Sequence, residues 1–139
     1  MDLITKARKF ATKKHKGKLY NNQPFMVHPE EVYTILQALL TYQNGQDDDL
    51  LAAALLHDVL EDTEVSYSQL KKEFNEDIAN LVREVTDEGW NIFPNLKTQR
   101  GIMLKFADRL ANLSHIHDWN KENQEKYIGK SKFWKEKGE

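Results

Sequence analysis

A histidine and three acidic residues interrupt the most apolar stretch of the chain. Nine of the eleven residues at 50–60 are apolar and the other two are His57 and Asp58, with Glu61 and Asp62 close behind. A run of this kind is typical of a buried helix, and helical spacing would place all four side chains along one edge of it. Carboxylates on such an apolar helix are costly unless a cation accompanies them. The pattern therefore favours a metal site over the alternative, a helix that reaches solvent at Asp58 and ends there.

Two residues elsewhere in the chain could complete such a site. His28 stands at an expected helix start, and Asp108 lies at the edge of an apolar helical face. With the histidine–aspartate pair above, they would supply two neutral imidazoles and two carboxylates, which cancel a 2+ charge and leave positions for water. Spacing alone does not bring them together, and His28 could instead simply cap its helix. Asp108 could likewise pair with Lys105 or Arg109.

The elements that must position these residues are helical. Periodicity, caps and breakers predict helices at 3–16, 28–43, 48–62, 67–74, 78–85, 97–115 and 121–136, the third N-capped by an aspartate at 47–49. Turn-rich sequences predict loops at 18–25 and 87–95, the second near the site, and Asn75 is expected to take a turn with positive φ. No stretch alternates as a strand would. The sequence therefore predicts an all-α fold in a single domain, residues 1–139.

Composition and charge narrow the class of protein. The 139 residues carry a formal net charge of −2 and include no cysteine, and no apolar run approaches the roughly 18 residues of a membrane-spanning helix. We therefore expect a cytoplasmic protein with no membrane partner. Seven Lys or Arg residues at 6–18 contrast with an acidic stretch at 47–64, and packed together the two would give the site a basic wall. A nucleic-acid partner is not expected, because the basic cluster lacks interleaved aromatic residues and a base-reading helix.

Four segments carry a resemblance to a known family. In chain order they are HKGKLYNNQPFMVHPEEV, AAALLHDVLEDT, FNEDIANLVREVTD and LKFADRLANL. Together they resemble the HD-domain phosphohydrolases, and most of all the hydrolase domain of the RelA/SpoT stringent-response enzymes and its small free-standing relatives. The resemblance covers residues 7–113. HD alone is a weak signal, but HD followed by ED, with an upstream HP and a downstream ADRLxN, is highly specific.

The resemblance implies a helical HD-domain bundle that removes the 3′-pyrophosphate of guanosine tetra- or pentaphosphate. It implies one divalent ion, usually manganese, with four ligands: His28, His57, Asp58 and Asp108. It also implies that Glu61 and Asp62 position and deprotonate the attacking water. Asn112 matches a family position near the nucleotide. By the same resemblance, Lys105 is expected either to have a structural role or to face the phosphates.

The chain departs from the family pattern where the family contacts its nucleobase. The family commonly reads His-x-Gly-Gln-x-Arg, with the Arg against the guanine, whereas here Lys18 stands at the Gln position and Tyr20 at the Arg position. We expect both to contact the substrate, but a ring stacks on any purine without reading its edge, so base discrimination should be weak. One alternative is hydrolysis of another nucleotide ester, such as a monophosphate or the 2′-phosphate of a dinucleotide. Another is a non-catalytic nucleotide-binding module, which would need neither Glu61 nor Asp62.

Overall fold

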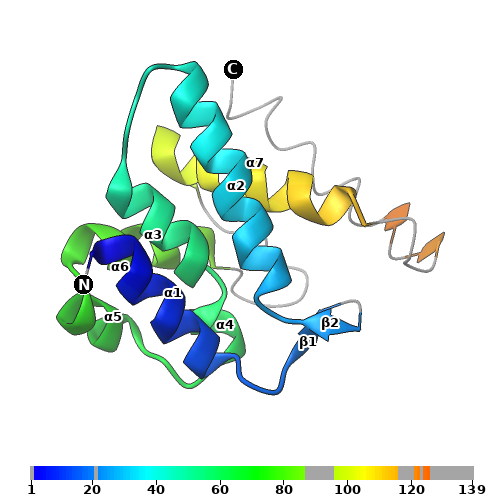
Figure 1. The fold of residues 1–139 in the computed structure, drawn as a ribbon, viewed down its shortest axis with the longest axis horizontal. Coiled ribbons are helices and arrows are strands. Elements are labelled where there is room, and N and C mark those ends of the chain that lie inside the picture. The colour runs from blue at the N-terminus through cyan, green and yellow to red at the C-terminus, as the bar shows by residue number, and fades with distance from the viewer. Residues whose placement is uncertain (1, 21, 87–95, 116–120, 123, 126–139) are drawn as a thin grey trace.

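The computed structural model describes residues 2–20, 22–86, 96–115, 121–122 and 124–125. The all-α prediction is confirmed: within this part of the chain, helices enclose the core and the sheet is confined to four residues (Figure 1). The main helices are α1 (Leu3–Lys14), α2 (Val27–Tyr42), α3 (Asp48–Leu56), α4 (Val59–Asp62), α5 (Tyr67–Glu73), α6 (Glu76–Val85) and α7 (Gln99–Leu113). None of the described helices is long and apolar enough to cross a membrane.

Two predicted elements fall wholly or mostly outside the described residues. The predicted loop at 87–95 lies outside them entirely. Of the predicted helix at 121–136, only residues 121–122 and 124–125 are described, and these four are helical. The other predicted helices are observed with their ends shifted by a few residues, apart from the central one.

α3 lies at the centre of the helical core. Every residue at 50–56 is buried, as expected for a helix that is apolar on all sides. α3 packs against α1, α2, α6 and α7, and Figure 1 shows it between α1 and α2. Its N-cap is Asp47, whose carboxylate accepts a hydrogen bond from the backbone N–H of Leu50. This confirms the predicted aspartate cap and ties the start of the helix to its first turn.

The predicted helix at 48–62 is interrupted, so this prediction was wrong at its centre. α3 ends at Leu56 and the short α4 begins at Val59, with His57 and Asp58 between them. The backbone loosens toward ψ ≈ 0 here, with ψ of −24° at His57 and −2° at Asp58. Side chains of adjacent residues on a regular helix diverge by about 100°. The loosened turn instead lets the imidazole and the carboxylate face the same site.

A small hairpin replaces the predicted loop before α2, which is a second correction. β1 (Leu19–Tyr20) pairs antiparallel with β2 (Gln23–Pro24), and Asn22 closes the turn with φ of 65°. Asn tolerates this left-handed conformation better than most residues. Strands of two residues are too short to show alternation, so periodicity could not predict them. The hairpin places Tyr20 beside the first turn of α2.

The two caps between α4 and α6 show how one turn prediction failed. Ser66 accepts from the backbone N–H of Gln69, which confirms the predicted start of α5. Asn75, expected to have positive φ, is instead extended with φ of −165° and accepts from the backbone N–H of Ile78 as the N-cap of α6. Its side chain therefore replaces a missing helical acceptor rather than permitting a left-handed turn.

Glu84 of α6 anchors the start of α7. Its carboxylate accepts hydrogen bonds from the backbone N–H groups of Lys97 and Thr98 and from the Thr98 hydroxyl, at 2.8–2.9 Å. An anion at a helix N-terminus is also favoured by the helix dipole. A Cβ atom added to Gly101 would lie 2.0 Å from this carboxylate, so the contact requires glycine at position 101.

Arg100 joins α7 to two other helix starts. Its guanidinium lies 2.7 Å from Asp47, the cap of α3, and 2.8 Å from Asp77 in the first turn of α6. Planar two-pronged contacts of this kind are geometrically specific. Arg100 therefore holds the N-terminal ends of α3, α6 and α7 together. This contact helps to set the position of residues further along α7.

Replacing Gly101 with Ala should destabilise the protein, because the new methyl group displaces the Glu84 carboxylate from its three partners. We expect the free energy of unfolding to fall by about 1–2 kcal/mol, despite the better helix propensity of Ala. The matched control is Gly45→Ala, where the nearest atom to an added Cβ is 3.7 Å away. Urea denaturation measures both. A Gly101→Ala variant as stable as the parent would show that the Glu84 anchor contributes little.

Candidate metal centre

Three residues distant in sequence converge on one buried point. His28 lies in the first turn of α2, His57 follows α3, and Asp108 lies within α7. One ligand atom from each lies within 4.8 Å of the others, an arrangement that could hold a metal ion. Asp108 Oδ1 is 2.8 Å from His28 Nε2 and 3.4 Å from His57 Nε2. All three side chains are buried.

Asp58 stands at the edge of this group. Its Oδ2 is 3.2 Å from His57 Nε2 and 3.8 Å from His28 Nε2, and it is less deeply buried than the other three. The four residues proposed from sequence as metal ligands therefore lie together. Three of them satisfy the mutual distances of a metal site, and the carboxylate of Asp58 lies beside the two imidazoles.

The surroundings of His57 favour a positive charge at this point. Burial would lower the pKa of His57, but the charges and contacts of Asp58 and Asp108 hold it well above its ordinary value. Its Nδ1 lies 2.7 Å from the carbonyl oxygen of Ala54 and must donate, because a carbonyl can only accept. In the neutral ring Nε2 is then unprotonated. This atom is buried and has no hydrogen-bond partner in the described part of the chain, although it faces two carboxylates. Metal-ligating histidines commonly donate their other N–H to a carbonyl in this way, so the donor set fits a divalent ion.

Lys105 keeps Asp108 ionised. Burial alone would raise the pKa of Asp108, but the Lys105 charge and contacts with the two histidines hold it well below its ordinary value. Lys105 Nζ lies 3.4 Å from Asp108 Oδ2 and donates to the Val85 carbonyl at 3.2 Å. The ammonium group is thus engaged inside the protein, where it supports the carboxylate rather than projecting into solvent.

Glu61 and Asp62 lie on α4, which follows the candidate ligands His57 and Asp58, and both are exposed. Partial loss of water around Asp62 raises its pKa, and the charge of Asp58 raises it further. Lys18 donates a hydrogen bond from its Nζ to the Asp62 backbone carbonyl. This contact fastens the start of the hairpin to α4, and it places one residue of the predicted basic wall beside the acidic segment. Lys14 adds an ion pair to Glu64 at 3.2 Å.

Tyr20 and Asn112 also reach the centre. The Tyr20 hydroxyl donates to Asn112 Oδ1, and the Asn112 amide donates to Asp108 Oδ1 at 3.4 Å. The ring of Tyr20 lies 5.0 Å from that of His28. Every residue chosen from sequence as a site candidate is therefore placed in or next to one region of the fold.

Two histidines at or near the site were missed. His115 Nε2 lies 2.8 Å from Glu31 on α2, and its ring meets Tyr20 edge to face at 5.9 Å. It follows Asp108 by seven residues, two helical turns, and this spacing was the available signal. His15 is buried against Phe25, with ring centroids 4.3 Å apart, and neither ring nitrogen has a hydrogen-bond partner among the described residues.

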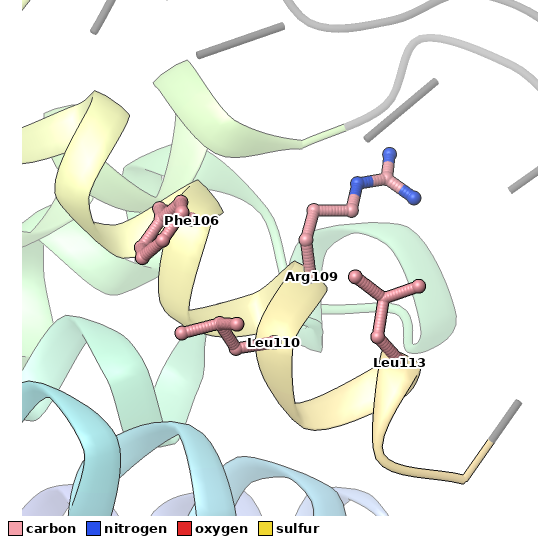
Figure 2. A pocket seen from close by; sticks show the side chains of 4 residues that line it. All are labelled: Phe106, Arg109, Leu110 and Leu113. Atoms are coloured by element: carbon pink, nitrogen blue, oxygen red, sulfur yellow. The ribbon is translucent and has the colours of Figure 1, made fainter. Parts of the chain in front are cut away.

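A separate pocket lies on the other side of α7. Four side chains, labelled in Figure 2, line about 200 Å³ of space: Phe106, Arg109, Leu110 and Leu113. None of them is a candidate metal ligand. Asp108, the candidate ligand on α7, lies on a different face of that helix. The pocket is therefore distinct from the candidate centre.

The chain belongs to the HD domain family, whose model matches residues 7–89. That match contains His28, His57 and Asp58, and it ends before Asp108. A relative from Xenopus tropicalis, guanosine-3′,5′-bis(diphosphate) 3′-pyrophosphohydrolase MESH1, is 30% identical over 91% of this chain and 79% of its own length. An Aquifex aeolicus guanosine-3′,5′-bis(diphosphate) 3′-pyrophosphohydrolase is 34% identical over 88% of this chain, which spans about a fifth (19%) of that relative.

A solved structure supports the same relationship. It is described as a metazoan ortholog of SpoT that hydrolyzes ppGpp, and it superposes with a TM-score of 0.78 at 28% sequence identity. The superposition covers 95% of this chain and 83% of the other. The fold predicted from the resemblance, a helical HD-domain bundle, is confirmed.

Removing a ligand carboxylate should abolish metal binding. We expect Asp108→Asn to weaken Mn²⁺ binding by more than about 100-fold, because the change removes a charge and a hard oxygen donor. Asp58→Asn should lose the ion as well if all four residues bind it. Titration calorimetry on metal-free protein measures both, with Asp48→Asn on the exposed start of α3 as the control. Full affinity in Asp58→Asn would reduce the centre to three protein ligands, and full affinity in Asp108→Asn would refute it.

Proposed function

We propose that the chain is a divalent-metal-dependent phosphohydrolase that removes the 3′-pyrophosphate of guanosine 3′,5′-bis(diphosphate), with manganese as the ion. The observation that carries the proposal is the buried group of His28, His57 and Asp108. Its weight comes from its setting, a chain of the HD domain family that resembles a named 3′-pyrophosphohydrolase over most of both lengths.

The proposed ligands are the two histidines, Asp108 and Asp58. A bound divalent ion would supply positive charge for the phosphoryl oxygens and favour ionisation of an attacking water. The chain's own contribution is to orient the imidazole of His57 and to keep the carboxylate of Asp108 ionised before the ion arrives. The Ala54 carbonyl sets the tautomer of His57, and Lys105 holds Asp108 as an anion.

We assign proton removal from the attacking water to Glu61 and Asp62. Both are accessible to solvent on α4 and follow the ligands by about one turn. The raised pKa of Asp62 makes its carboxylate a stronger base than an ordinary aspartate. Because the base must be unprotonated, activity should decline as the pH falls toward the raised pKa of Asp62.

The basic residues of α1 and the hairpin suit a polyphosphate substrate. Lys14 and Lys18 lie next to α4 and engage Glu64 and the Asp62 carbonyl. Positive groups at the mouth of a site attract anions and raise their local concentration. We propose that Lys18, Asn112 and Tyr20 border the bound nucleotide, with Lys18 on the α4 side and Asn112 on the α7 side.

Conservative substitutions of the proposed bases should separate catalysis from metal binding. Glu61→Gln and Asp62→Asn should keep Mn²⁺ affinity near that of the parent but reduce kcat by roughly 10²–10⁴-fold, the usual cost of losing a general base. Glu76→Gln, on an exposed residue at the start of α6, is the matched control. Turnover near the parental rate in both variants would mean that the water is deprotonated by another group.

A substrate panel tests the proposed activity and its closest rival together. Purified protein with Mn²⁺ should release pyrophosphate from guanosine 3′,5′-bis(diphosphate). Because Tyr20 offers no bidentate hydrogen bonds to a base edge, the adenosine analogue should differ by less than about tenfold in kcat/KM. A strong guanosine preference would show that another residue reads the base. Release of orthophosphate from a nucleoside monophosphate or a dinucleotide 2′-phosphate, without pyrophosphate from either polyphosphate, would favour the alternative ester hydrolase.

A further inference from the structure

Tyr20 makes three contacts beside the candidate metal centre. Its hydroxyl donates to Asn112 Oδ1, and the amide of Asn112 donates in turn to Asp108 Oδ1 at 3.4 Å. Its ring is tilted by 37° against the ring of His28, with centroids 5.0 Å apart. On another side it meets the ring of His115 at 5.9 Å and an angle of 89°. Tyr20 therefore touches one proposed ligand directly and reaches a second through Asn112.

The contact with His115 is itself held from behind. His115 Nε2 lies 2.8 and 3.1 Å from the two carboxylate oxygens of Glu31, so this end of the imidazole is tied to α2. The hydrogen bond of the Tyr20 hydroxyl is made to α7, at Asn112 Oδ1. The hydroxyl and two sides of the ring are all engaged, which restricts the orientation of the side chain.

We propose that Tyr20 is a positioning residue for the metal centre, holding the imidazole of His28 and, through Asn112, the carboxylate of Asp108 in the orientation that binds the ion. This role rests on the metal centre of the proposed function. His28 Nε2 and the Asn112 amide both contact the same atom, Asp108 Oδ1. A change in either neighbour therefore shifts the same ligand atom. Loss of such outer partners typically lowers metal affinity 10–100-fold.

The positioning role differs from simple stacking of the ring on a nucleobase. Stacking uses the face of the ring, which phenylalanine reproduces. Positioning of Asn112 uses the hydroxyl, which phenylalanine lacks. Tyr20→Phe therefore separates the two roles, and metal binding measured without nucleotide excludes any contribution from stacking.

The test is titration calorimetry of Mn²⁺ into metal-free protein for the parent, Tyr20→Phe and Tyr20→Leu. We expect the Kd to rise about tenfold in Tyr20→Phe, where only the Asn112 contact is lost. In Tyr20→Leu, which also loses the contact with His28, the rise should approach 100-fold. Tyr42→Phe is the control, since Tyr42 is 89% exposed near the end of α2. Thermal unfolding of the metal-free variants shows whether each is folded, and Tyr20→Phe preserves the ring if Tyr20→Leu does not fold.

The outcomes distinguish this role from the proposed function. Parental Mn²⁺ affinity in folded Tyr20→Phe and Tyr20→Leu would overturn the positioning role, whether or not the protein hydrolyses a nucleotide. Weakened Mn²⁺ binding in the variants would support it even if the parent proves inactive on guanosine polyphosphates. A parent that binds no Mn²⁺ would overturn both proposals together. Unchanged Mn²⁺ affinity with a raised KM would assign Tyr20 to the nucleotide instead.

Discussion

The structure depends on how two histidines and two aspartates share a buried space. Nε2 of His57 lies 3.2 and 3.4 Å from carboxylate oxygens of Asp58 and Asp108, and its other ring nitrogen donates to the Ala54 carbonyl. Without a proton or a metal ion, the Nε2 lone pair would face those oxygens. Lone pairs facing one another in a water-poor interior repel, and the cost is large where the dielectric is low. Either a proton or a metal cation relieves this repulsion. Metal binding should therefore compete with protonation of His57, and the metal affinity should fall as the pH is lowered.

The scaffold positions these groups by holding the starts of α3, α6 and α7 together. The apolar α3 is buried on every side and carries His57 to its C-terminal end. Contacts of Glu84 and Arg100 hold the start of α7 against α3 and α6. They thereby fix the position of Asp108, which lies about two helical turns further along α7. The acidic residues of α4 remain exposed beyond the break at 57–58. His28, His57 and Asp108 are thus buried, while the proposed bases are accessible to water.

The sequence predicted much of this arrangement, and its failures have physical causes. Helical periodicity and caps located the main helices, and the scarcity of charges on the apolar run singled out His57 and Asp58. Periodicity could not foresee the break between α3 and α4, because local propensity there is helical and tertiary contacts decide the outcome. The hairpin was too short to have a pattern. The contact of Glu31 with His115 joins residues 84 positions apart, and only the packing of α2 against α7 creates it.

Anomalous diffraction from crystals grown with Mn²⁺ would locate the ion. We expect one manganese ion bound by His28 Nε2, His57 Nε2 and a carboxylate oxygen of Asp108, with Asp58 turned toward it. We also expect the Nδ1 contact of His57 with Ala54 to persist. A peak elsewhere, or none at this point in crystals saturated with Mn²⁺, would contradict the assignment of this buried group as the metal centre.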